Sequence, residues 1–89
     1  MIFNELDLNI PSDAKIDDYR KFEDSDNYIE RVYGEYAILT IRTQKLRKFI
    51  DKADTAVRDM TVEQMLLIEQ MVQMNAYRKT LEKRIRRMM

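Results

Sequence analysis

The chain has 89 residues, with sixteen basic and sixteen acidic side chains that leave no net charge, and it contains neither cysteine nor histidine. Disulfide frameworks and thiolate metal sites are therefore excluded, and the commonest general base and metal ligand is missing. A single glycine and a single proline argue against a β-rich fold and against any glycine-rich phosphate loop. We expect one small all-α domain that is not an enzyme, holds no metal and needs no cofactor.

Residues 1–26 are predicted to form an acidic N-terminal arm, because acidic residues outnumber basic ones here and no helical period is sustained. Pro11, followed by Ser12 and Asp13, is typical of a turn or a helix start. Two interpretations stay open. The arm either packs on the rest of the chain through its scattered apolar residues or remains a partly disordered tail.

The domain that follows, residues 27–89, begins with a helix predicted at about 27–52. Asn27 is a suitable N-cap, with Glu30 three residues on as its capping-box partner. Apolar residues then recur in alternating steps of three and four, with Thr43 as the one polar member of the stripe. Gly34 lies inside this helix, either as a tolerated surface residue or as a point where another chain approaches closely.

A second helix is predicted at about 61–88, and it starts at a capping box formed by Thr61 and Gln64. Its apolar stripe runs from Leu67 to Met88 and contains one charge, Arg78. Two such helices joined by a short connection form an antiparallel hairpin. Folding the chain back near Ala56 places Arg78 level with Tyr36, so we expect its guanidinium to stack on that ring.

The hairpin carries apolar residues outside both stripes, in the half near the loop. A patch of this kind on a monomer predicts self-association, so we assign it to a homo-oligomer interface. The alternative is that the N-terminal arm folds over it. The predicted interface residues are Ile38, Ile41, Met65, Leu66, Ile68 and Val72.

Location and large partners follow from hydropathy and charge. No apolar run approaches the length of a membrane span, and no signal-peptide pattern is present, so we expect a cytoplasmic protein without membrane contact. The basic C-terminal end would suit nucleic acid, but it suits the negative end of a helix dipole equally well. With zero net charge, binding to duplex nucleic acid is disfavoured.

A site for a phosphorylated ligand is the remaining candidate. An oligomer brings several copies of the same side chains together; arginine offers a fork to phosphate, and tyrosine stacks on a base. Each candidate also has an ordinary role, which is core packing for the tyrosines and solvation for the lysine. The candidate ligand-binding residues are Tyr28, Arg31, Tyr36, Thr43, Lys45 and Arg78.

The hairpin sequence also resembles a family of small helical-hairpin proteins that recur in tailed-phage genomes. The resemblance covers about residues 28–86. The matching residues, mostly heptad positions, are Tyr28, Arg31, Val32, Leu46, Phe49, Ile50, Leu66, Leu67, Gln70, Met74, Tyr77, Leu81, Arg84 and Ile85.

That family is similar in turn to the hairpin domain of phage anti-CBASS and anti-Thoeris sponge proteins. These proteins form oligomers, often hexamers, that sequester cyclic nucleotides or cyclic ADP-ribose signals. The resemblance implies ligand contacts for Tyr28, Thr43 and Lys45, with the lysine and threonine in exchanged order. Gln70, Met74 and Arg78 resemble a second-helix series. The chain departs from the sponges in lacking their second-helix tryptophan and in carrying the acidic arm.

Two functions from different classes follow. The first is a phage counter-defence protein that sequesters a cyclic nucleotide immune signal in the host cytoplasm without cleaving it. The alternative is an inhibitor or regulator that docks on a host defence protein, for example a nuclease, through its apolar face or acidic arm.

Overall fold

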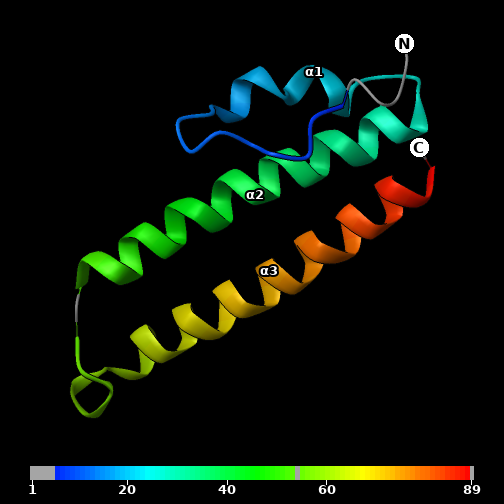
Figure 1. The fold of residues 1–89 in the computed structure, drawn as a ribbon. Helices are drawn as coiled ribbons and strands as arrows, with labels where there is room; N and C mark the ends of the chain where they lie inside the picture. Colours follow the sequence, from blue (N-terminus) through cyan, green and yellow to red (C-terminus); the bar gives the residue numbers. More distant parts are fainter. Residues whose placement is uncertain (1–5, 54, 89) are drawn as a thin grey trace.

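The computed structural model describes residues 6–53 and 55–88, and every regular element in this part of the chain is a helix (Figure 1). Residues 1–5 of the predicted arm, with Asp54 and Met89 of the predicted hairpin, lie outside the described residues. No described helix has the length and hydropathy needed to cross a membrane. The elements in chain order are the 3-10 turn η2 (Ile16–Asp18), α1 (Arg20–Glu23), α2 (Tyr28–Ala53), the 3-10 turn η3 (Val57–Asp59) and α3 (Val62–Met88).

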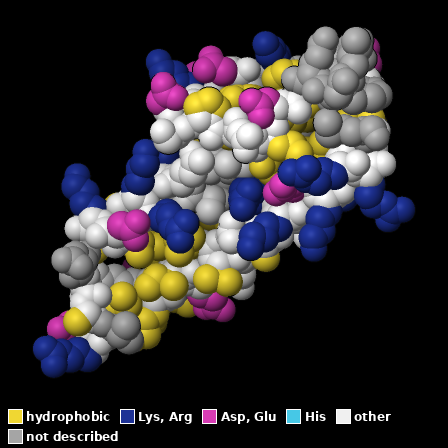
Figure 2. Space-filling view, in the orientation of Figure 1, with side chains coloured by type: hydrophobic (Ala, Val, Ile, Leu, Met, Phe, Trp, Pro, Cys, Tyr) yellow, Lys and Arg dark blue, Asp and Glu magenta, His cyan; other side chains and the backbone are white. Residues whose placement is uncertain are grey.

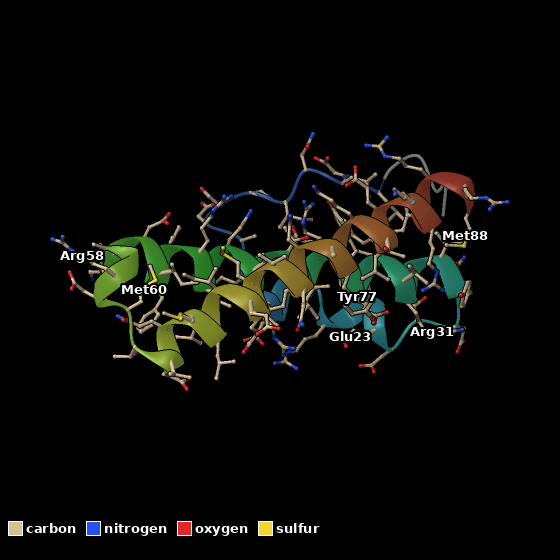
Figure 3. All side chains as sticks on the ribbon, turned by 90° about the horizontal axis from the view of Figure 1, so that it is seen from below. Glu23, Arg31, Arg58, Met60, Tyr77 and Met88 are labelled. Carbon is tan, nitrogen blue, oxygen red and sulfur yellow. The ribbon has the colours of Figure 1, made fainter. Side chains whose placement is uncertain are left out.

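The two long helices, α2 and α3, lie side by side and run in opposite directions (Figure 1). We call the end where α2 begins and α3 finishes the open end, and the end that carries residues 53–62 the loop end. Figure 3 labels Arg31 and Met88 at the open end, and Arg58 and Met60 at the loop end. The prediction of an all-α fold from the helical periods is confirmed for the residues that the structure describes.

The start of α2 is capped as predicted at Asn27 but not at Glu30. The Asn27 side-chain oxygen accepts hydrogen bonds from the backbone N–H groups of Ile29 at 2.9 Å and Glu30 at 3.3 Å, two donors that the helix itself leaves free. The N–H of Asn27 donates to the Ser25 hydroxyl oxygen at 3.0 Å, and that hydroxyl donates to the Glu30 carboxylate at 3.4 Å. Ser25 thus takes the place predicted for Glu30 in the cap.

The start of α3 is a reciprocal capping box, as predicted. The N–H of Gln64 donates to the Thr61 hydroxyl oxygen at 3.1 Å, and the N–H of Thr61 donates to the Gln64 amide oxygen at 2.9 Å. Because both bonds form between residues three apart, this helix start is determined locally.

The described part of the arm packs on α2, which lies between the arm and α3 (Figure 1). Two tyrosines of α2 hold it in place. The Tyr33 hydroxyl donates to the Asp7 carbonyl oxygen at 2.7 Å, and the Tyr36 hydroxyl donates to the Leu8 carbonyl oxygen at 2.7 Å. Each bond provides a donor for a backbone carbonyl in a segment without regular structure. Of the two interpretations of the arm, the packed one is therefore correct for these residues.

α1 approaches α2 closely at Gly34. A Cβ atom on this residue would lie 2.9 Å from the Cβ of Phe22 and 3.1 Å from the backbone nitrogen of Glu23. Both distances are shorter than ordinary van der Waals contact. The glycine therefore marks the close approach of the chain's own arm, rather than a tolerated surface position or another chain.

The hydrophobic core sits at the open end and joins all three layers. Its α3 members, Leu81 and Ile85, are completely buried. The full cluster of buried residues comprises Leu6, Ile10, Val32, Tyr33, Tyr36, Ala37, Ile41, Leu81 and Ile85. Ile41 is 2% exposed and Ile38 is 6% exposed, which differs from the expectation that both face outward. For Ile41, the alternative interpretation is correct: the N-terminal arm, and not a second chain, covers this part of the predicted interface.

Candidate functional site

A polar groove lies between α2 and α3, near the middle of both helices. Its volume is about 240 Å³. We call it the polar groove; its lining residues are Thr40, Thr43, Gln44 and Arg47 from α2, and Asn75 and Arg78 from α3.

Arg78 is held at the groove by neighbours on its own helix. Its Nε and Nη2 atoms donate to the Asn75 side-chain oxygen at 3.2 and 3.0 Å, and its Nη1 lies 3.8 Å from a Glu82 carboxylate oxygen. The side chain is 22% exposed, so its stem is buried while its head reaches polar partners. The expected stacking on Tyr36 is wrong, because the cation–π contacts among the described residues do not include this pair. The Tyr36 ring is buried and its hydroxyl donates to the arm.

The threonines and the arginines have different capacities in the groove. The hydroxyls of Thr40 and Thr43 donate to carbonyl oxygens one turn back, at 2.8 and 2.7 Å, so their hydrogens are already used. They offer oxygen acceptors to a ligand. The guanidinium groups of Arg47 and Arg78, together with side-chain amides, supply donors and positive charge. This combination suits an anion with hydroxyl groups, such as a sugar phosphate.

A second cluster of aromatic and basic side chains lies at the open end. The guanidinium carbons of Arg31 and Arg84 lie 5.8 and 5.9 Å from the centroid of the Tyr28 ring, and Arg84 donates to the Tyr28 hydroxyl. The ring is 53% exposed. At ~1.5 Å of rise per residue, Tyr28 and Thr43 are about 22 Å apart along α2, so this cluster is separate from the polar groove within one chain.

The predicted ligand residues therefore occupy separate places in the chain. Thr43 and Arg78 share the polar groove, whereas Lys45 lies beside the arm in a shallow hollow lined also by Asp13 and Asp17. Tyr36 belongs to the core. Sequence reasoning did not assign to the ligand site five neighbours of the predicted residues: Thr40, Gln44, Arg47, Asn75 and Arg84. Helical spacing would have found three of them, since Thr40 and Arg47 lie three residues before and four residues after Thr43, and Asn75 is three before Arg78.

An apolar cleft of about 450 Å³ opens between the helices at the loop end, lined in part by Phe49, Ile50, Leu67 and Ile68. Hydrophobic side chains gather on the surface in this part of the molecule (Figure 2). Three residues of the predicted interface remain largely exposed, namely Met65 at 48%, Leu66 at 51% and Val72 at 60%.

The fold and the groove define a class, that of small all-α proteins whose two long antiparallel helices enclose a polar site. A sequence model of one family, Sequestin, matches residues 26–87, which is the whole hairpin except its last residues. The chain belongs to the Sequestin family. No curated protein and no solved structure matches the chain.

Proposed function

We propose that this protein sequesters a phosphorylated small molecule in the polar groove without cleaving it. The observation that carries the proposal is the pair of arginines, Arg47 and Arg78, which face the same groove from different helices. Two guanidinium groups at one site favour a phosphate group over a neutral ligand. The family name is consistent with a sequestering role, and the resemblance to phage sponges supports a cyclic nucleotide or cyclic ADP-ribose signal as the ligand.

A homo-oligomer, for example a hexamer, completes the site. A groove of about 240 Å³ is smaller than the ~300–1,000 Å³ typical of small-molecule sites, so one copy covers part of a cyclic dinucleotide. Tyr28 has an exposed ring beside Arg31 and Arg84, and such a ring is suited to stacking on a base. We assign this cluster and Lys45, brought by neighbouring copies, to the rest of the ligand.

The biological setting follows from the same resemblance. We place the protein in the cytoplasm of an infected host cell, as a phage counter-defence protein that lowers the concentration of an immune signal. Binding alone achieves this, provided that the protein is abundant relative to the signal.

The second candidate function is a protein inhibitor that docks on a host defence protein. The observation that favours it is the outward position of acidic side chains on the packed arm. Asp13, Asp17, Asp18, Glu23 and Asp24 are all exposed. A row of carboxylates on a folded arm would attract a basic surface such as that of a nuclease.

The first experiment separates the two functions. The purified protein is screened by thermal shift against cyclic dinucleotides, cyclic trinucleotides and cyclic ADP-ribose isomers, and the bound fraction is then heated. A sequestering protein releases the ligand chemically intact after heating. Release of a cleaved ligand would contradict sequestration, and co-purification of a host protein with no nucleotide shift would favour the inhibitor.

The second experiment tests the groove through Arg78→Leu. The leucine completes the apolar stripe of α3, so we expect equal or higher thermal stability. Loss of a charged hydrogen bond should weaken ligand binding by ~1.5–3 kcal/mol, measured by calorimetry with the nucleotide that the screen identifies. Lys79→Leu is the matched control, since this lysine is exposed beside the groove residue and should leave affinity unchanged. Unchanged affinity in Arg78→Leu would remove the groove as the site.

A further inference from the structure

The loop half of the hairpin has no core of its own. We define it as residues 44–53 of α2 and 62–77 of α3. None of these residues is buried, whereas the other half of the hairpin holds all the hairpin residues of the buried cluster. The physical reason is that the arm provides a third layer over the open half of α2 and reaches the loop half beside the exposed Lys45 (Figure 1). Two packed helices without a third layer leave one side of each apolar stripe in water.

The same half exposes large apolar side chains around the loop-end cleft. Phe49 is 64% exposed and Val62 is 73% exposed, in addition to Met65, Leu66 and Val72. The cleft of about 450 Å³ between the helices is bordered by Phe49 and has room for side chains from outside the chain. Exposed apolar residues beside an apolar cleft are typical of an interaction surface.

Charge on the loop half is divided between the two helices. The basic residues of α2 in and next to this half are Arg42, Lys45, Arg47, Lys48 and Lys52, against Asp51 as the single acid. Residues 62–77 of α3 contain two acids, Glu63 and Glu69, and no lysine or arginine. Lys45 lies beside the arm and Arg47 lines the polar groove, whereas Lys48 and Lys52 are exposed on α2. Among the described residues, no ion pair joins α2 to α3, so the exposed charges of the two helices remain available for contacts with another molecule.

We infer that the loop half is the interface between two copies of this chain, and that α2 of each copy packs against α3 of the other. This pairing covers the exposed apolar residues of both chains and sets each basic helix beside an acidic one. The opposite arrangement, with α2 against α2, would bring Lys48 and Lys52 of each chain together. A surface that carries both charges in this way is complementary to itself, as a two-fold interface requires. The inference specifies the oligomer invoked in the proposed function, but it does not depend on ligand binding.

Charge reversal tests the pairing, because each change acts across the interface twice. Lys48→Glu and Glu69→Lys both lie away from helix ends, so neither disturbs a cap or a helix dipole. Sedimentation without nucleotide should show the parent above its monomer mass of 10.8 kDa. Each variant alone should weaken association by roughly tenfold or more, because like charges then meet at both contacts.

Mixing the two variants distinguishes this interface from any effect within one chain. In a mixed pair, one copy carries Lys48→Glu and the other carries Glu69→Lys, so opposite charges face each other again at both contacts. Association should return to the parent level on mixing. Lys79→Glu in the open half is the control and should associate like the parent. A monomeric parent at all concentrations, or variants that stay apart on mixing, would overturn the inference.

Val72→Asp provides an independent measurement if a charge variant loses helicity. The side chain is 60% exposed in the single chain, so aspartate should leave the circular dichroism spectrum of the hairpin intact. It should nevertheless dissociate the assembly, because a buried charge at an apolar contact is unfavourable. A variant that associates as strongly as the parent would place the interface elsewhere. If the unsubstituted protein associates but binds no nucleotide, the proposed function is contradicted and this interface is not.

Discussion

Replacing Gly34 with alanine sets helix propensity against packing of the arm. In the interior of a helix, alanine is favoured over glycine by ~1 kcal/mol. Here the added methyl group would lie 2.9 Å from the Phe22 Cβ and 3.1 Å from the Glu23 nitrogen. Because the neighbouring atoms belong to the start of a side chain and to backbone, they cannot rotate away. The whole of α1 must move outward.

Such overpacking typically costs ~1–3 kcal/mol. After the gain in propensity, Gly34→Ala should destabilise the full chain by up to ~2 kcal/mol. In a chain that begins at Ser25, the clash is absent while the α2 cap is retained, and the same substitution should stabilise the helix by ~1 kcal/mol.

The assay is urea unfolding followed by circular dichroism, applied to both lengths of chain. The deciding quantity is the difference between the two effects of Gly34→Ala, which should be ~1–3 kcal/mol. Arg42→Ala and Arg42→Gly, at an exposed position of the same helix, calibrate the propensity term. Equal stabilisation by Gly34→Ala in both lengths would refute the close approach of α1.

Three further predictions concern stability. Burial, with smaller contributions from neighbouring charges, raises the pKa of Tyr33 to about 12. In the unfolded chain the tyrosine hydroxyl has a pKa of ~10, so the stability that comes from the neutral Tyr33 is complete below that pH and is lost as the pH rises towards 12. The urea concentration at the midpoint of unfolding should therefore fall over this pH range. It should fall less in Tyr33→Phe, which has no hydroxyl to titrate. Leu81→Ala should cost ~2–5 kcal/mol by calorimetry or urea unfolding, because the side chain is completely buried. Thr61→Ala should lower the stability measured in the same way by ~0.5–2 kcal/mol, because the Gln64 N–H loses its acceptor.

The candidate site was partly predictable for a geometric reason. Thr43 and Arg78 interrupt the apolar stripes of their helices, and residues on facing stripes must meet in a hairpin. Tyr28 and Lys45 were grouped with them by residue type. Helical rise separates the first from the groove, and the second faces the arm instead. Residue types suggested the chemistry, but the faces of the helices determine which groups share a site.

The sequence by itself determined the two long helices, because their signals are local: the apolar period along each helix and the capping residues Asn27, Thr61 and Gln64 at their starts. Only the tertiary structure decided where the arm lies. Its apolar residues have no period, and its carbonyl oxygens find their donors in tyrosine hydroxyls 26 and 28 residues away. That placement buried Ile41 in one cluster with the arm and left most of the loop half uncovered, since contacts between distant residues depend on three-dimensional fit rather than on spacing along the chain.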